Sequence, residues 1–345
     1  MPEGVWARIA LTLAIASLGA FAAVLLGIPL PLLLGPMIAC LIAALLGAKM
    51  RGMGNVGLFM RTFLGVAVGS SITPAVVAEI PGYIDTLLFI PVFILVIGFA
   101  GYPLFRRVFK MNHATAYYAS MPGGLQDMLV FGEEAGADVR ALSLIHATRV
   151  LVIVTLAPVV MQFVWHVDLT APPGQSAVET DPREIAVMVF AGLAGWRIAA
   201  RIGLFGASIL GPMILSAILS LSGVITQRPP AELIMATQFF IGIAVGTKYA
   251  GITTRELRDY VLAGLFFATA LSLISLGFIE VIQLLHLADP MDTFLAFLPG
   301  GQGEMVVIAI VAGADLAFVV THHLFRLILV ISLAPIVAKI WSNRR

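Results

Sequence analysis

Two carboxylates, each placed five residues after the proline of a repeated Pro-Gly-Gly sequence, are the side chains best suited to ion chemistry in this chain. The first copy reads MPGGLQDM and supplies Asp127 after Pro122; the second reads LPGGQGEM and supplies Glu304 after Pro299. A carboxylate binds a proton or a hard cation, and one held in apolar surroundings is a functional candidate. The repetition therefore predicts a pair of ion-binding carboxylates.

A histidine and an arginine follow each carboxylate, three residues apart and within apolar sequence. The pairs are His146 with Arg149 and His323 with Arg326. Arg149 lies about 15 Å along the axis of a helix that would begin at residue 139, because a helix rises ~1.5 Å per residue. A charge at that depth in a membrane is costly unless it is paired or solvated. We expect the arginines to attract an anion, and the histidines either to relay protons or to pack through hydrogen bonds.

Structural roles for the same residues compete with these. Each arginine could stabilise a broken helix by binding its carbonyl groups, or could pair with Asp127 or Asp138. Asp138 and Asp315 end two AGAD sequences directly before apolar segments, and we expect both to cap the helices that follow. If the arginines were fully paired with Asp127 and Glu304, a cation would become the better substrate.

The Pro-Gly-Gly sequences themselves are predicted to interrupt helices. Proline disfavours helix in the residue before it and cannot donate its own amide, while glycine removes side-chain bulk. Non-helical backbone at membrane depth is tolerated only where it is buried in protein or lines a wet cavity. We expect a half-helix to open at Pro122, with free amides that attract an ion; the alternative is a simple turn between helices. The predicted binding residues are Pro122, Gly123, Gly124, Gln126, Asp127, His146 and Arg149 from the first copy, and Pro299, Gly300, Gly301, Gln302, Glu304, His323 and Arg326 from the second.

The composition requires these residues to be positioned by membrane helices. Hydrophobic residues make up 60% of the 345 residues and charged residues 11%, far from the roughly 25% charged residues of a soluble domain. We predict an all-α polytopic membrane protein whose N-terminal apolar run is retained as a helix. The single cysteine, Cys40, excludes disulfides and cysteine-based metal sites. The expected apolar segments are 6–27, 30–48, 57–78, 85–105, 115–132, 139–165, 184–203, 205–224, 232–250, 260–285, 292–312 and 316–340.

The chain also contains an internal duplication. At an offset of 177 residues, 14 of the 38 positions in 121–158 are identical to those in 298–335. LLGPMI is repeated as ILGPMI, and GVAVG is repeated as GIAVG, which is typical of a close-packing helix face. We predict a first transmembrane repeat over 1–165, a polar linker over 166–183 and a second repeat over 184–345.

The distribution of lysine and arginine favours an inverted second repeat. In one layout, each Pro-Gly-Gly segment enters the membrane and returns to the same side. Of the lysines and arginines counted, only Arg183 and Arg228 then lie outside the cell, and Arg344 and Arg345 lie in the cytoplasm. This layout gives two inverted-topology repeats of about five to six helical segments and places both termini in the cytoplasm. Whether the Pro-Gly-Gly segments are re-entrant or cross the membrane as broken helices is left open.

The repeated MPGGLQDM and LPGGQGEM, the paired GAD and the HxxR that follows each resemble the AbrB family of bacterial inner-membrane proteins. The resemblance extends over nearly the whole chain. It implies membership of the cation:proton antiporter and anion transporter superfamily, with inverted repeats and broken helices. It also implies a bacterial inner-membrane location and, by analogy, a homodimer.

The resulting functional hypothesis is a secondary active transporter of a small charged solute, preferably an organic anion, coupled to H⁺ or Na⁺. The alternative in the same class is a cation/proton antiporter. The alternatives from other classes are a membrane sensor or regulator and a membrane-bound metal oxygenase, although the six histidines show no HxxxH or ExxH spacing. We expect no enzymatic activity, no cofactor, no metal and no nucleic-acid partner; the expected partners are the solute, the coupling ion and the bilayer.

Overall fold

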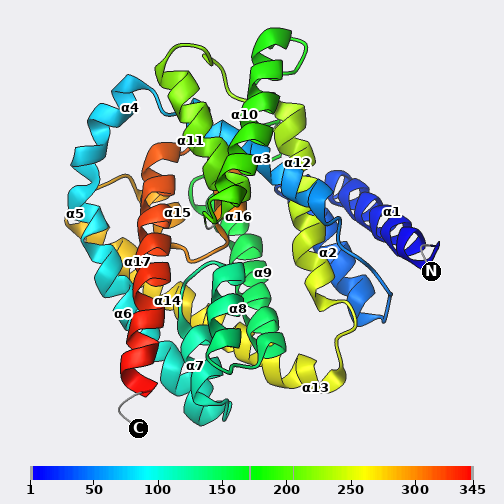
Figure 1. Ribbon diagram of the computed structural model, residues 1–345, viewed down its shortest axis with the longest axis vertical. Helices are drawn as coiled ribbons and strands as arrows, with labels where there is room; N and C mark the ends of the chain where they lie inside the picture. The colour runs from blue at the N-terminus through cyan, green and yellow to red at the C-terminus, as the bar shows by residue number, and fades with distance from the viewer. Residues whose placement is uncertain (1–2, 171, 205, 343–345) are drawn as a thin grey trace. The chain divides into compact units, whose positions relative to one another are not determined.

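The long apolar segments form helices in the structure, a computed structural model that describes residues 3–170, 172–204 and 206–342. Every regular element within these ranges is helical (Figure 1). Five segments are long and apolar enough to cross a membrane, and Asn55–Ser70 with Pro74–Leu87, bent by 72°, can form a sixth. The chain is therefore an all-α, multi-pass membrane protein, as predicted. The five segments are Gly4–Leu25, Phe89–Val108, Val139–Val164, Thr254–Leu284 and Leu316–Ile340.

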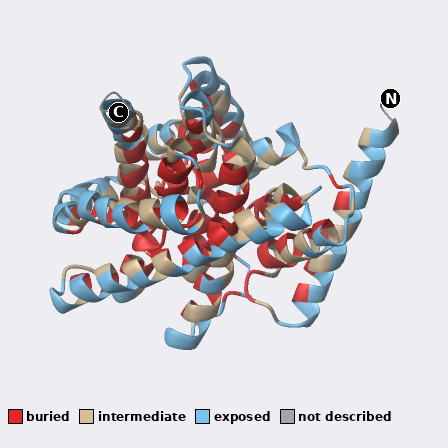
Figure 2. Cartoon of the chain, turned by 90° about the horizontal axis from the view of Figure 1, so that it is seen from below, coloured by how far each residue is buried: buried red, intermediate tan, exposed pale blue. Residues whose placement is uncertain are grey.

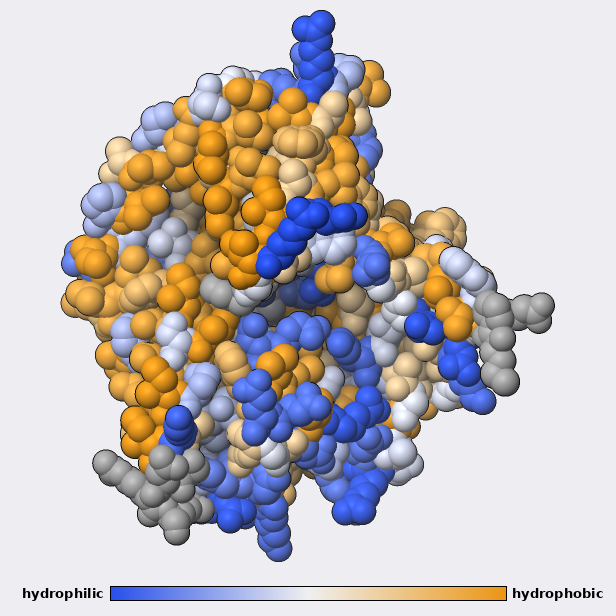
Figure 3. All heavy atoms as spheres, viewed as in Figure 1, coloured by the Kyte–Doolittle hydropathy of each residue, from blue (hydrophilic) through white to orange (hydrophobic). Residues whose placement is uncertain are grey.

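The outer surface carries the apolar residues that a bilayer requires. Figure 3 shows apolar side chains over much of the face in view. The N-terminal helix, α1 (Glu3–Leu25), is exposed along most of its length (Figure 2), and Trp6, Leu18 and Phe21 on it are more than half exposed. Exposure of large apolar side chains on a helix of this length is expected where the surrounding solvent is lipid. Arg344 and Arg345 lie outside the described residues, and the orientation of the termini stays a prediction.

The helices belong to two compact units, and each unit takes segments from both halves of the sequence. Unit 1 comprises Met1–Pro81, Pro158–Ile252 and Gly303–Ala317; unit 2 comprises Gly82–Ala157, Thr253–Gln302 and Phe318–Arg345. These units do not coincide with the predicted repeats, since a compact unit is defined by contacts and a repeat by sequence.

Unit 1 is held together by close helix crossings at glycine. Gly65 lies in α3 (Asn55–Ser70) and faces the backbone of Ile209 in α11 (Ala207–Leu221). Gly242 lies in α12 (Ala231–Gly246) and faces the backbone of Leu33 in α2 (Pro31–Leu45). A Cβ atom at either glycine would collide with the facing carbonyl oxygen, so the crossings need glycine at these positions. The repeated GVAVG and GIAVG sequences therefore form the predicted close-packing faces, and each packs against the LGPM helix of the other half. Other elements that lie wholly or partly in unit 1 are α4 Pro74–Glu79, η1 Ile80–Tyr83, α10 Pro182–Arg201, η3 Thr247–Tyr249 and α16 Gln302–Ala312.

Unit 2 contains both Pro-Gly-Gly sequences and is packed around aromatic rings. Phe93 makes edge-to-face contacts with Phe278 and Phe297, with ring centroids 5.1 and 5.5 Å apart, and Phe105 contacts Phe267 at 4.9 Å. Such pairs add to the stabilisation from burial alone. The elements that lie wholly or mostly in unit 2 are α5 Ile84–Leu87, α6 Phe89–Pro103, η2 Leu104–Val108, α7 His113–Ser120, α8 Leu125–Glu134, α9 Val139–Val164, α13 Thr254–Glu256, η4 Leu257–Val261, α14 Leu262–Leu284, α15 Pro290–Phe297 and α17 Leu316–Ser342.

The duplication extends to secondary structure in the segments that carry the candidate site. The helices α7, α8 and α9 begin at residues 113, 125 and 139, and α15, α16 and α17 begin at 290, 302 and 316, in each case 177 residues later. Both halves therefore present a short helix, an interruption, a second short helix and a long helix. Their opposite orientation in the membrane stays a prediction.

Candidate functional site

The first Pro-Gly-Gly sequence interrupts a helix, as predicted. The helix α7 ends at Ser120 and α8 begins at Leu125. Met121 has φ −79° and ψ 132°, an extended conformation that the following proline imposes, and Gly124 is extended as the N-cap of α8. The second half-helix therefore opens at Leu125, and the expectation that it opens at Pro122 is wrong. Pro122 lies within the break because the backbone from Met121 to Gly124 is not helical.

The second Pro-Gly-Gly sequence forms the same kind of break. The helix α15 ends at Phe297, Leu298 is extended with φ −74° and ψ 122°, and α16 begins at Gln302. Pro299 and Gly300 are buried, so this non-helical backbone is enclosed by protein, as is required at membrane depth.

The two carboxylates lie in the first turns of the helices that follow the breaks. Asp127 is in the first turn of α8 and Glu304 in the first turn of α16, where amide groups and the helix dipole favour negative charge. Asp127 is half-buried, and its carboxylate lies against Gly124, where a Cβ atom would collide with Oδ2. Glu304 is 7% exposed. Asp127 belongs to unit 2 and Glu304 to unit 1, so their placement around one ion stays a prediction.

The half-helices that carry the carboxylates differ in environment. The residues of α16 from Gly303 to Ile310 are all buried, whereas in α8 only Met128 and Gly132 are buried. Gln126 is exposed on α8, and Gln302 is partly buried, with an amide nitrogen that has no hydrogen-bond partner among the described residues. The sequence repetition gave no sign of this difference.

Both arginines bind carbonyl groups of the broken helices. Arg149 Nη1 donates to the Met121 carbonyl oxygen at 3.3 Å, and its Nη2 donates to that of Gly123 at 3.1 Å. Arg326 Nη1 donates to the Leu298 carbonyl oxygen at 3.4 Å, a longer bond to the position that corresponds to Met121. Each arginine is 2% exposed. The structural role that the sequence left open, binding of exposed carbonyls, is therefore present in both halves.

The histidines bind the carbonyl groups at the ends of the preceding helices. His146 Nε2 donates to the Tyr118 carbonyl oxygen at 3.1 Å, and His323 Nε2 donates to that of Leu295 at 2.9 Å, again 177 residues apart. His323 Nδ1 accepts from Arg326 Nη2 at 3.4 Å, which requires the neutral ring with its hydrogen on Nε2. His146 Nδ1 is buried and has no hydrogen-bond partner among the described residues. Hydrogen-bonded packing, one of the two expected histidine roles, is thus observed.

The first break lies against the helix that carries Arg326. A Cβ atom at Gly123 would meet Val330 Cγ1 at 3.0 Å, and one at Gly124 would lie 3.8 Å from Leu327 Cδ2. The side chains of Arg149 and Arg326 are both buried. Among the residues that the structure describes, no carboxylate lies within salt-bridge distance of Arg326. Arg326 is therefore a buried guanidinium with no opposite charge beside it in the described part of the chain.

Asp138 has the capping role that the sequence predicts. Its Oδ1 accepts from the Ala141 amide at 3.0 Å at the start of α9, and its Oδ2 accepts from the Tyr260 hydroxyl at 2.8 Å. In the described part of the chain, no three His, Cys, Asp or Glu side chains gather in an arrangement that could hold a metal ion.

One buried polar pair was not predicted from the sequence. His322 Nε2 lies 2.9 Å from Thr86 Oγ1, and both side chains are buried. Comparison of the repeats could not reveal it, because the residue that corresponds to His322 in the first half is Ile145.

The chain is similar over its length to a family of known sequences. The profile of the family described as "Transition state regulatory protein AbrB" matches residues 32–342. The "Uncharacterized protein YhjN" of Bacillus subtilis (strain 168) is 28% identical, with 94% of this chain and 90% of the relative aligned. The "Putative regulator AbrB" of Escherichia coli (strain K12) is 26% identical, with 99% of this chain and 98% of the relative aligned.

Proposed function

Because the chain belongs to the AbrB family and is a multi-pass membrane protein, we propose that it is a secondary active transporter of a small organic anion, coupled to H⁺ or Na⁺. The bacterial inner membrane is its proposed location. The observation that carries the proposal is the buried Arg326, which has no carboxylate partner among the described residues.

The energetics of a buried guanidinium favour an anionic solute. An ionised group removed from water costs several kcal/mol unless an opposite charge or hydrogen bonds compensate it. Arg326 Nε is buried and has no hydrogen-bond partner among the described residues. The planar guanidinium binds a carboxylate through two parallel hydrogen bonds, one of which Nε can supply. A carboxylate-bearing solute would therefore neutralise the charge and satisfy the remaining donor.

The proposed coupling groups are the carboxylates of the first helical turns. Asp127 and Glu304 each lie in the first helical turn after a break, close to the free amides of that helix. A change in the exposure of these carboxylates to water during transport would alter their affinity for H⁺ or Na⁺. A transporter needs such a difference in ion affinity between its two states. We propose no enzymatic reaction and no cofactor for this chain.

The names of the family and of the Escherichia coli relative refer to regulation. A regulatory effect would follow from the proposed transport if the solute itself controls other proteins. We do not propose direct nucleic-acid binding, because the basic residues are dispersed among apolar segments and the sequence contains no long basic stretch that could contact a nucleic acid.

The test is transport into liposomes that contain the purified protein and a pH-sensitive dye. Mono-, di- and tricarboxylates are supplied singly under an imposed pH or Na⁺ gradient. We expect at least one to drive ion movement, and Arg326→Gln to abolish it. The matched control is Arg201→Gln, which removes an exposed arginine at the end of α10. Proton movement that requires a cation, occurs without any organic anion and persists in Arg326→Gln would favour the cation/proton antiporter instead.

A further inference from the structure

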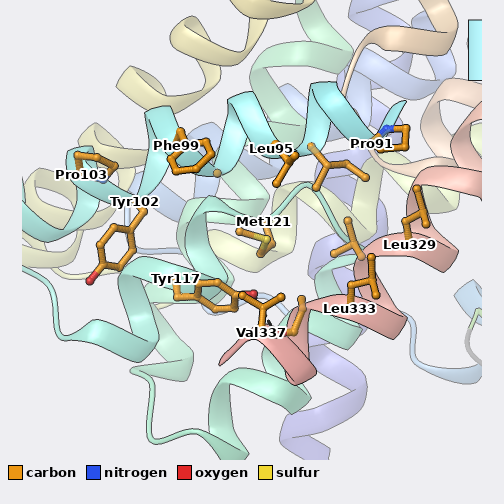
Figure 4. A pocket seen from close by; sticks show the side chains of 14 residues that line it. Pro91, Leu95, Phe99, Tyr102, Pro103, Tyr117, Met121, Leu329, Leu333 and Val337 are labelled. Carbon is orange, nitrogen blue, oxygen red and sulfur yellow. Dashed lines mark hydrogen bonds between the residues drawn. The ribbon is translucent and has the colours of Figure 1, made fainter. Parts of the chain in front are cut away.

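Unit 2 contains an apolar pocket that the proposed transport mechanism does not use. It has a volume of about 370 Å³ and lies between α6, the end of α7 and α17 (Figure 4). This volume is within the range of about 300–1,000 Å³ that small-molecule pockets occupy. Pro91, Leu95, Phe99 and Pro103 line it from one face of α6, and Leu333 and Val337 line it from α17.

The walls of the pocket suit a hydrocarbon chain. The only side-chain hydroxyl groups among its lining residues, those of Tyr102 and Tyr117, already take part in hydrogen bonds. The Tyr102 hydroxyl lies 2.8 Å from His113 Nδ1, and the Tyr117 hydroxyl donates to the Ala334 carbonyl oxygen at 2.9 Å. All other side chains that line the pocket are apolar. A polar solute would lose its hydrogen bonds to water there and gain none from the pocket, whereas an alkyl chain has no such hydrogen bonds to lose.

The pocket opens onto an exposed apolar surface formed by two candidate membrane spans. Its rim includes Leu95, Phe99 and Leu333, which are 59%, 79% and 51% exposed. These residues belong to the candidate spans Phe89–Val108 and Leu316–Ile340. The molecules able to enter from that side are therefore those of the bilayer.

Basic residues lie beyond one end of the pocket. Figure 4 shows Pro91 and Leu329 at one end and Pro103 at the opposite end. Arg106 and Arg107 lie three and four residues after Pro103, and Lys339 lies two residues after Val337 on α17; all three are exposed. Arg106 Nη1 donates to the Met111 carbonyl oxygen at 2.8 Å, which holds its side chain in place.

We propose that this pocket binds one acyl chain of an anionic phospholipid, whose headgroup contacts Arg106, Arg107 and Lys339. The apolar wall of the pocket favours an acyl chain, and the basic residues at its end favour a negatively charged headgroup. The bound chain would contact Met121 and Val330, which line the pocket. Met121 supplies a carbonyl group to Arg149, and Val330 packs against Gly123, so the lipid would support the first break.

The test is native mass spectrometry of the purified full-length protein titrated with dioleoyl phosphatidylglycerol or dioleoyl phosphatidylcholine. We expect one tightly bound lipid molecule per protein chain. Phosphatidylglycerol should bind at least about tenfold more tightly than phosphatidylcholine, because each basic residue near an anionic headgroup raises the affinity several-fold. Arg106→Gln with Arg107→Gln should remove the preference and leave weaker binding of both lipids. Arg201→Gln, the matched charge control in unit 1, should retain it.

A second pair of variants tests the pocket itself. Gly98→Leu fills the pocket, where a Cβ atom would meet only the flexible end of Met121 at 3.2 Å. It should reduce phosphatidylglycerol binding by about tenfold or more, whereas Gly277→Leu, on an open surface of α14, should not. Leu95→Trp, introduced from the exposed rim, serves if Gly98→Leu does not fold.

Equal binding of both lipids by the wild type, or unchanged binding by the folded pocket variants, would overturn the proposal. Dissociation of a dimer by Gly98→Leu with unchanged lipid binding would also overturn it and would assign the pocket to a second copy of the chain.

Discussion

At the scale of single residues, Gly124 determines where the Asp127 carboxylate lies. Gly124 has φ −65° and ψ 140°, which alanine adopts without strain, so backbone conformation does not require glycine there. A Cβ atom would collide with Asp127 Oδ2 and displace the carboxylate. We predict that Gly124→Ala leaves the free energy of unfolding within about 1 kcal/mol of wild type, but lowers the number of ions moved per anion in liposomes. An unchanged ratio would show that Asp127 does not carry the coupling ion.

The histidines allow a graded prediction at the same scale. His323 makes one hydrogen bond to the Leu295 carbonyl and one to Arg326, while His146 Nδ1 has no hydrogen-bond partner in the described structure. Replacement by alanine leaves a buried carbonyl unpaired, which costs about 1–3 kcal/mol. We predict that His323→Ala lowers the thermal unfolding temperature in detergent more than His146→Ala. The reverse order would contradict the hydrogen-bond assignment.

Most candidate site residues could be predicted from the sequence because the repetition identified them. Arg149 and Arg326 were found in this way, and their equivalent bonds to Met121 and Leu298 explain why both halves contain them. The sequence could not show whether these arginines bind backbone carbonyl groups or an anion, since both roles require the same side chain. The His322 pair with Thr86 was missed because its partners lie 236 residues apart and only one half has the histidine.

At the scale of elements, the glycine crossings of unit 1 predict a stability effect. Gly65→Ala in α3 would place a methyl group against the backbone of Ile209, and Gly242→Ala in α12 would do the same against Leu33. Overpacking of this kind typically costs about 1–3 kcal/mol. We expect both variants to unfold at lower temperature, as measured by thermal unfolding in detergent. Gly277→Ala, which has open space around it, is the control and should unfold like wild type or at higher temperature.

Element boundaries were less predictable than element types. The apolar segment expected over 57–78 ends as a helix at Ser70, and α4 starts at Pro74 after a bend of 72°. Thr73 caps α4 by accepting from the Val76 amide at 3.4 Å, so a Thr-Pro start signal outweighs continuous hydrophobicity. Similarly, the segment expected over 260–285 begins at Thr254, where Thr253 and Glu256 form a capping box. Hydropathy does not record such local hydrogen bonds.

At the scale of the whole molecule, the composition of the units predicts that neither half of the chain folds alone. Each compact unit contains segments of both halves, and in unit 1 the contacts of Gly65 with α11 and of Gly242 with α2 join one half to the other. A half expressed alone would expose these helix faces and their buried polar groups, which a membrane cannot satisfy. We predict that residues 1–165 and 184–345, expressed separately, are degraded or aggregate, and that co-expression restores a complex that can be purified through a tag on one half. The expected complex should unfold at a temperature lower than that of the intact chain, because the linker no longer keeps the halves together. Two separately stable halves that do not associate would contradict the division of the chain into units that each combine both repeats.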